Sequence, residues 1–360
     1  MAIALKLHTK KHIPSVRRLP TGVVLLLLAV VLSVGIVLST GTGFLEIAFA
    51  DVLRILLAKL ANAPGLTAHL DDLTSVVVMD VRLPRILTAA LVGGGLAISG
   101  AVFQGILLNP LADPYTLGVS AGAAFGASLA LLLNVTFLGL WSVPAFAFGG
   151  AVATLMVVIY LTASSGDLSS GNLILSGIIV AAILSAGVSF IKYMADEQVN
   201  IIIFWLMGSF ASKTWAETGL TAVAVALGLG IFFFFSRDLN VLALGGRTAG
   251  SLGVSPRKIA LLLLVSASLV SAMCVAVSGI IGFVGLLVPH MVRFITGPDN
   301  RRLIPAAALT GACLLLCADT LTRAVLPQEI PIGVITALIG GPFFCYIYRK
   351  RQMQQVGGGS

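Results

Sequence analysis

The sequence predicts an all-α polytopic membrane protein with about ten transmembrane helices, and three observations lead to this prediction. Hydrophobic residues make up 58% of the 360 residues and charged residues only 10%, whereas a soluble domain carries about 25% charged residues. The mean hydropathy is +1.07. Apolar runs of the length that a spanning helix needs, about 20 residues, recur along the whole chain. We therefore expect one transmembrane domain over residues 1–350.

Each predicted helix rests on one apolar run. The first run exceeds the 7–15 apolar residues of a signal peptide, which favours a retained helix. The eighth is short and contains Pro289, which predicts a broken or tilted helix. A further apolar run, 201–210, is too short to span and is expected at the surface or as a re-entrant segment. The ten runs are 21–40, 86–107, 115–133, 140–162, 173–194, 214–236, 257–277, 282–296, 303–325 and 331–348.

The positions of the basic residues predict the orientation of the chain. Lys and Arg are enriched in cytoplasmic segments of membrane proteins, and most of the 22 basic residues here lie in 6–18, 237–258, 293–302 and 349–351. This places both termini in the cytoplasm, as an even number of helices requires. We expect a multi-pass protein of the plasma (inner) membrane. Residues 356–360 resemble a flexible linker rather than part of the domain.

The net charge of +8 does not indicate a nucleic-acid-binding protein. The basic residues fall at the ends of apolar runs and are not interleaved with aromatic residues, as in a single-strand binding groove. The four cysteines all lie inside apolar runs without Cys-x-x-Cys spacing, so no metal site is predicted.

The longest polar segment between helices on the predicted cytoplasmic side is 237–258. It contains Leu239, Val241, Leu242, Leu244 and Leu252 among glycines and charged residues. Two short helices with an exposed apolar face fit this pattern, and such a face usually marks a partner-binding surface. A plain connecting loop is the alternative.

Two other functions need consideration. Residues 118–122 match the G-x-S-x-G pattern of hydrolases, with Ser120 as the nucleophile and His290 as the one later histidine. That motif requires a strand before the serine, whereas these residues lie in a Gly/Ala-rich segment typical of packed membrane helices. An ion-coupled secondary transporter needs buried carboxylates. Asp319 is nearly alone, and it is spaced to pair with Arg323 on one helix face.

The sequence resembles the FecCD family, the permease subunits of type II ABC importers for iron–siderophores, haem and cobalamin. The resemblance extends over residues 82–349. The matching segments are RLPR at 82–85, ISGA at 98–101 with Gln104, NPLADP at 109–114, LGVS at 117–120, GFVGLLVPH at 282–290 with Arg293, AD at 318–319 with Arg323, EIPIGV at 329–334 and GGP at 340–342.

The resemblance implies the BtuC-like permease fold, a second permease copy (most simply a homodimer), two ATPase subunits and a soluble substrate-binding protein. It also implies that this chain binds no cofactor and that ATP–Mg binds to the ATPase subunits. Helices five and ten line the pathway in this family. The residue roles that the resemblance implies are ATPase coupling for Leu244, Gly245, Ala249, Gly250, Leu252 and Gly253, binding-protein docking for Arg82, Arg85 and Arg323, and the cytoplasmic gate for Ser169 and Ser170.

The sequence departs from the family pattern at Gly246, Arg247 and Thr248 and in the long outer loop, 41–81. The predicted function is a permease, not itself an enzyme, that moves a metal chelate (iron–siderophore, haem or cobalamin) from the binding protein into the cytoplasm. The alternatives are the ion-coupled transporter and, less favoured, the intramembrane serine hydrolase.

Overall fold

The computed structural model describes residues 20–43, 47–67, 70–164, 169–324 and 329–356. All regular elements among these residues are helices. Seven are long and apolar enough to cross a membrane, and three further apolar helices are shorter. These ten are α1 Thr21–Gly41, α4 Leu83–Ile106, α5 Val119–Leu132, α6 Ser142–Ser164, α7 Ser170–Met194, α9 Trp215–Phe234, α12 Pro256–Ser278, α13 Val284–Thr296, α14 Asn300–Ala324 and α15 Ile332–Val356.

Short helices connect the long ones. The α-helices are α2 Phe49–Leu60, α3 Asp72–Val76, α8 Val199–Leu206, α10 Ser236–Leu242 and α11 Gly246–Ser251. A π-helical segment, Val77–Arg82, joins α3 to α4. It lies just before Pro84, which lacks the N–H that an α-helix would use at that position. The 3₁₀ turns are Pro64–Thr67, Pro114–Leu117, Gly139–Trp141 and Asp196–Gln198.

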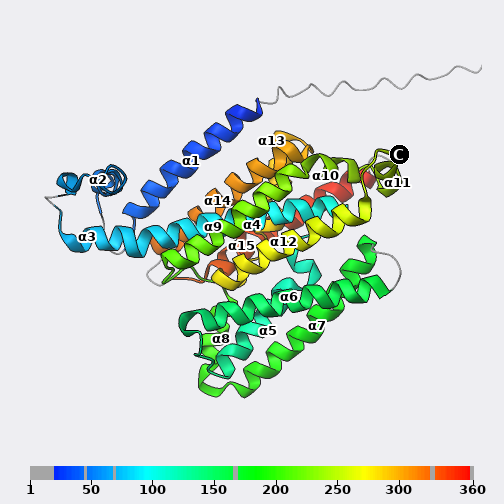
Figure 1. Ribbon diagram of the computed structural model, residues 1–360, viewed down its shortest axis with the longest axis horizontal. Coiled ribbons are helices and arrows are strands. Elements are labelled where there is room, and N and C mark those ends of the chain that lie inside the picture. The colour runs from blue at the N-terminus through cyan, green and yellow to red at the C-terminus, as the bar shows by residue number, and fades with distance from the viewer. Residues whose placement is uncertain (1–19, 44–46, 68–69, 165–168, 325–328, 357–360) are drawn as a thin grey trace, which may run out of the picture.

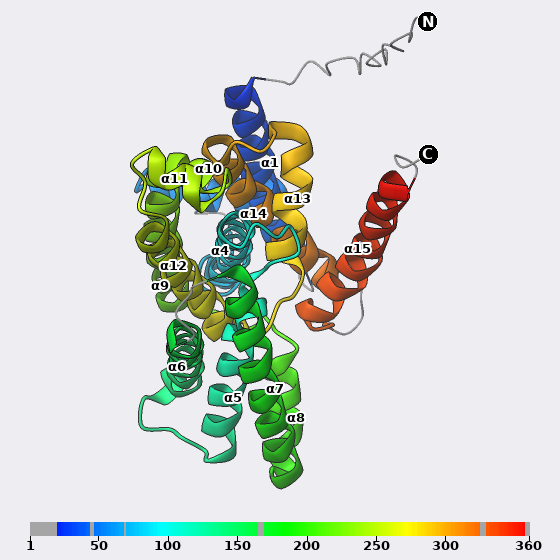
Figure 2. The same ribbon diagram turned by 90° about the vertical axis from the view of Figure 1, so that its right-hand side faces the viewer.

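Helix α4 forms the centre of the bundle and packs against α14, α9, α12 and α13 (Figures 1 and 2). Small residues let its backbone approach its neighbours closely. A Cβ added at Gly93 would collide with the carbonyl of Gly311, and one at Gly100 with the carbonyl of Gly285. Such contacts drive helix association in lipid, where apolar burial contributes little.

Helices α5, α6 and α7 form a second group beside this centre, and α15 lies apart from them on another side (Figure 2). The beginning of α1, the end of α15 and both α10 and α11 lie at one end of the bundle (Figure 2). Helices α2 and α3 lie at the opposite end (Figure 1). We call these the α10–α11 end and the opposite end.

The ten predicted runs correspond one to one with these ten helices, and the short helix α8 matches the run predicted not to span. The third helix begins later than predicted, at Val119, because Pro114–Leu117 forms a 3₁₀ turn and Gly118 has a φ of 76°. Helix α13 has 13 residues, or about 20 Å at 1.5 Å per residue. It is thus too short to cross the bilayer alone. The predicted linker at 356–360 falls almost wholly outside the described residues.

Candidate functional site

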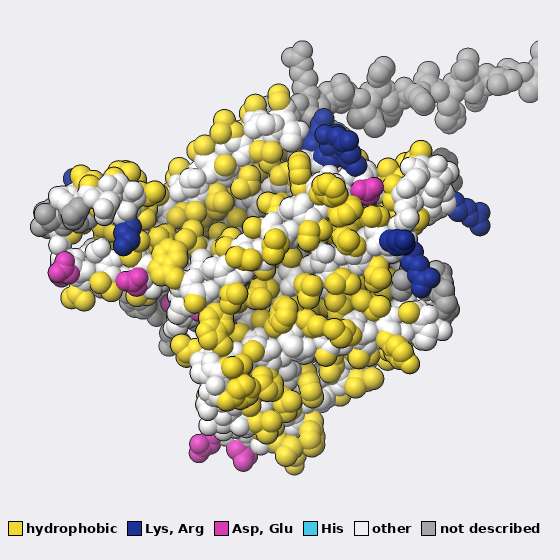
Figure 3. All heavy atoms as spheres, viewed as in Figure 1, with side chains coloured by type: hydrophobic (Ala, Val, Ile, Leu, Met, Phe, Trp, Pro, Cys, Tyr) yellow, Lys and Arg dark blue, Asp and Glu magenta, His cyan; other side chains and the backbone are white. Residues whose placement is uncertain are grey.

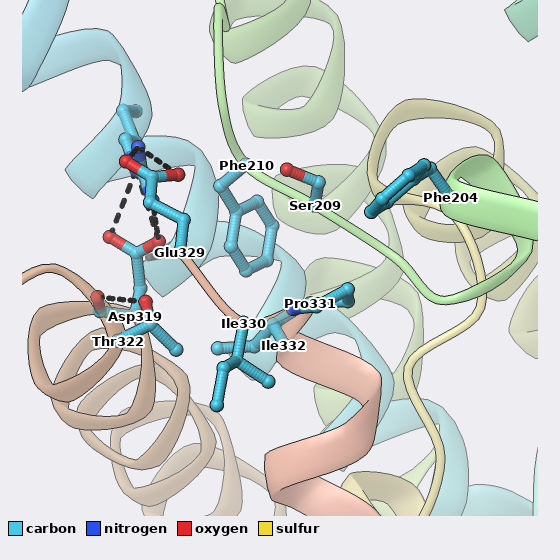
Figure 4. A pocket seen from close by; sticks show the side chains of 10 residues that line it. Phe204, Ser209, Phe210, Asp319, Thr322, Glu329, Ile330, Pro331 and Ile332 are labelled. Atoms are coloured by element: carbon cyan, nitrogen blue, oxygen red, sulfur yellow. Dashed lines mark hydrogen bonds and ion pairs between the residues drawn. The ribbon is translucent and has the colours of Figure 1, made fainter. Parts of the chain in front are cut away.

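An ionic cluster lies at the opposite end of the bundle. Arg85 of α4 donates to Asp319 of α14 and to Glu329, which precedes α15, with N–O distances of 2.9 Å in both cases. The Asp319 side chain is 2% exposed, and that of Glu329 is 42% exposed. Figure 4 shows the two acids converging on the same side of a small pocket. The cluster thereby joins α4, α14 and the segment that leads into α15.

Arg323 completes this cluster. It pairs with Asp319 at 3.1 Å, four residues earlier on α14, which confirms the pair expected from the spacing. It also donates to the carbonyls of Ser39 and Thr42 at the end of α1. The Arg323 side chain is only 7% exposed.

The three arginines assigned to docking all have partners within the chain. Arg82 is 8% exposed and donates to the carbonyl of Thr40, and Arg85 and Arg323 hold Asp319. A docking role requires the arginines to exchange these internal partners for those of another protein. The role stays a prediction.

The pocket beside the cluster has a volume of about 200 Å³. Phe204, Phe210 and Ile332 contribute apolar walls (Figure 4). Both acids are paired with arginines, so these ion pairs hold α4, α14 and the segment before α15 together. Within the described residues, no group of three His, Cys, Asp or Glu side chains is placed to hold a metal ion.

At the α10–α11 end, the segment predicted to form two short helices does so, as α10 and α11. Leu244 and Leu252 are 63% and 60% exposed. Gly250 is also exposed, whereas Ala249 is fully buried and packs beneath the surface. Gly245 and Gly253 have φ values of 98° and 83°, which favour glycine. The turns at both ends of α11 therefore depend on these two glycines.

A polar contact that the sequence did not reveal holds α10 in place. Asn240 donates to Asp299 at 2.7 Å and accepts from the backbone N–H of Asn300 at 2.9 Å. Burial raises the pKa of Asp299, but the Asn240 hydrogen bond, the Arg301 N–H and the nearby arginines together hold that pKa below its usual range. Asp299 thus stays ionised and fastens α10 to the start of α14.

The predicted gate residues, Ser169 and Ser170, lie at the same end. Ser169 caps α7 by accepting from the N–H of Asn172 at 3.3 Å. Both serines line a hollow of about 380 Å³ together with Leu242 and Gly246. The structure therefore brings the predicted gate and the predicted coupling segment to one place. Residues 165–168 of this loop lie outside the described part of the chain.

Two polar residues to which the sequence analysis gave no role, Gln104 and Tyr115, connect distant segments. Gln104 of α4 donates to the carbonyls of Gly285 and Leu286 and accepts from Arg293. The Tyr115 hydroxyl donates to the Ile281 carbonyl and accepts from the Ile281 N–H. Gln104 and Arg293 belong to the segments that resemble the family, and Gln104 is a polar residue inside a predicted span, but neither signal showed that the two residues meet.

The residues of the hydrolase pattern lie on separate helices. Ser120 is half-buried in the first turn of α5. His290 is buried in α13 and packs edge-to-face on Phe294 at 5.1 Å. The helix that carries Ser120 follows a 3₁₀ turn rather than a strand, so the elbow that the motif requires is absent there.

Comparison with known proteins gives a consistent result. A sequence profile described as the FecCD transport family matches residues 26–350. The cobalamin import system permease protein BtuC of Halobacterium salinarum is 41% identical over 296 residues, which cover 82% of this chain and 79% of that protein. The molybdate import system permease protein MolB of Haemophilus influenzae is 39% identical and covers 90% of this chain and 94% of its own.

A solved structure agrees with the sequence matches. It is described as a metal-chelate type ABC transporter in an inward-facing conformation. It superposes with a TM-score of 0.80 at 35% identity and covers 91% of this chain and 99% of its own.

Proposed function

The chain belongs to the FecCD transport family, and from that premise we propose that it is the membrane-spanning subunit of an ABC importer for a metal chelate. Iron–siderophore, haem and cobalamin are the proposed cargoes. Support comes from the cobalamin permease and the metal-chelate transporter, to which the chain is similar along most of its length. Because the chain is also similar to a molybdate permease, an oxyanion is the alternative cargo against which the metal chelates are tested.

The observation that carries the proposal is the exposed surface of α10 and α11. Leu244 lies in the turn between α10 and α11, Leu252 directly follows α11, and both have more than half of their surface exposed. Exposed apolar side chains outside a lipid-covered span favour a protein partner. That partner is an ATPase subunit, which binds ATP–Mg and supplies the energy, while this chain binds no cofactor.

A soluble binding protein delivers the cargo at the opposite end. Arg82, Arg85 and Arg323 are the proposed contacts, and Glu329 is the exposed acid that a docking carboxylate displaces from Arg85. Most simply, two copies of the chain enclose the pathway as a homodimer.

The test uses the chain reconstituted in liposomes with its ATPase subunits and binding protein. ATP-dependent uptake is measured separately for haem, cobalamin, a ferric siderophore and molybdate. The double variant Leu244→Ser/Leu252→Ser is expected to bind the ATPase subunits about tenfold more weakly and to lose uptake in proportion. Leu66→Ser is the control, because Leu66 is an exposed leucine at the opposite end.

Two results would contradict the proposal. The first is cargo accumulation in liposomes that contain this chain without ATPase subunits. The second is an equal loss of ATPase binding in the Leu66→Ser control.

A further inference from the structure

The chain is not helical between α12 and α13. Helix α12 ends at Ser278 and α13 begins at Val284. Gly279 and Phe283 have φ values of 73° and 67°, so the chain turns sharply at both ends of this stretch. We call residues 279–283 the helix break.

Contacts with α4 place the helix break at the middle of the membrane. A Cβ added at Gly95, the midpoint of α4, would lie 2.7 Å from Cys274, one turn before α12 ends. Gly100, further along α4, meets Gly285 at the start of α13. Because α4 spans the membrane and these contacts involve its central turns, the break lies near the middle of the membrane.

Only part of the backbone in the break has a partner. Tyr115 satisfies both the N–H and the carbonyl of Ile281. The N–H groups of Ile280, Gly282 and Phe283 donate no hydrogen bond to any residue that the structure describes. A Cβ at Gly282 would meet no atom within 4 Å, so this residue faces open space.

Such a backbone does not occur against lipid. Each unpaired N–H in hydrocarbon is costly, and irregular backbone at membrane depth is found only where it is buried in protein or lines a water-filled cavity. Gly282 is half-exposed rather than buried. The break therefore faces water.

A hollow of about 590 Å³ adjoins the break on this open side. Ile280 and Gly282 form one wall, Met207 a second, and Val334 and Leu338 of α15 the third. Backbone hydrogen bonds from Ile332 to Gly208 and from Gly333 to Met207, at 3.2 and 3.0 Å, fix the start of α15 there. None of the described residues lining the hollow carries a charge.

We propose that the helix break is a contact site for the cargo, halfway across the membrane. The cargo packs an apolar edge against Met207 and Leu338, and its oxygen acceptors bind the free N–H groups of the break. These neutral donors and apolar walls suit a bulky metal chelate with an apolar periphery. A small, strongly hydrated oxyanion loses more hydration here than the site replaces. This inference rests on the proposed function.

The first test measures water access. In a chain whose four native cysteines are replaced by alanine, single cysteines are introduced as Gly282→Cys, Leu338→Cys and, for control, Leu227→Cys. Leu227 lies on the span α9 and is 63% exposed, much like Leu338 at 69%. A charged methanethiosulfonate reagent reacts with the hydrated thiolate. We expect the first two variants to react at least about tenfold faster than the control, because a thiolate forms readily only in water.

The second test asks whether cargo reaches the site. A metal chelate that the complex imports is expected to slow labelling of Gly282→Cys during ATP turnover, whereas molybdate leaves the rate unchanged. Labelling as slow as that of Leu227→Cys overturns the inference, as does protection by molybdate alone. ATP-dependent uptake by the cysteine-free chain and by Leu227→Cys in the same vesicles tests the proposed function separately, and thermal denaturation of each variant shows whether it is folded.

Discussion

Asp319 shows what a single residue does in this protein. Its buried carboxylate pairs with two arginines that come from different helices, Arg85 and Arg323. Charges inside a membrane are tolerated when they pair with one another. Removing one partner leaves an uncompensated buried charge, which is more costly than the pair itself is stabilising.

Asp319→Asn is expected to lower the free energy of unfolding by about 3–5 kcal/mol, because it leaves the largely buried Arg323 without a carboxylate and Arg85 with only the partly exposed Glu329. Glu329→Gln is the matched control. Glu329 holds the same Arg85 but is 42% exposed, so its loss is expected to cost at most about 1 kcal/mol. Thermal denaturation of both variants in detergent measures the difference. Equal losses of stability in the two variants would contradict the conclusion that the buried Asp319 stabilises the cluster more than the exposed Glu329 does.

At the scale of elements, helices in this bundle are positioned by backbone contact. Gly100 of α4 lies against Gly285 of α13, and Gln104 bonds the carbonyls just beyond it. Helix α13 is too short to reach both membrane surfaces, so the bilayer alone does not fix its depth. Its position therefore depends on this crossing with α4.

Gly100→Ala is expected to destabilise the protein by about 1–3 kcal/mol, the usual cost of overpacking, because the added Cβ collides with the Gly285 backbone. Gly149→Ala in α6 is the control, since its Cβ meets no atom within 4 Å. That change is expected to be neutral or stabilising by up to about 1 kcal/mol, as alanine is the better helix former. Unfolding midpoints of the two variants are compared. If the Gly100→Ala variant is as stable as Gly149→Ala, the close contact between α4 and α13 at Gly100 does not contribute to stability as expected.

At the scale of the whole molecule, charge differs between the two ends. Lys and Arg side chains gather at the α10–α11 end, and most Asp and Glu side chains in the same view lie toward the opposite end, with an apolar band between them (Figure 3). Basic segments stay in the cytoplasm. The α10–α11 end is therefore expected to face the cytoplasm, where ATP is available.

Reporter fusions test this orientation. Alkaline phosphatase fused after Val356 is expected to be inactive and green fluorescent protein fused there to be fluorescent, because α15 ends at the α10–α11 end. Fusions after Ala195, which follows α7, are expected to give the reverse pattern. Phosphatase activity after Val356 would contradict the predicted orientation.

The sequence by itself determined the class, the helices and the family of this protein. Lipid tolerates few charges and requires each crossing segment to satisfy its own backbone, so composition and the length of apolar runs are sufficient to locate the spanning helices. The leucines of segment 237–258, which stand among glycines and charged residues, predicted the short helices α10 and α11, because this pattern too is local in the sequence. The Asp319–Arg323 pair followed from a spacing of four residues within one helix.

Only the tertiary structure decided which distant residues meet. Arg85 and Asp319 are 234 residues apart in sequence, and Tyr115 is 166 residues from Ile281. Such pairs depend on the rotation and depth of each helix in the bundle, which many weak packing contacts set together and no local pattern encodes. The short apolar run and Pro289 predicted a broken or tilted eighth helix, whereas Pro289 lies inside the continuous helix α13 and the break precedes that helix. The place of the break beside the middle of α4, with unpaired N–H groups facing a hollow, required the structure.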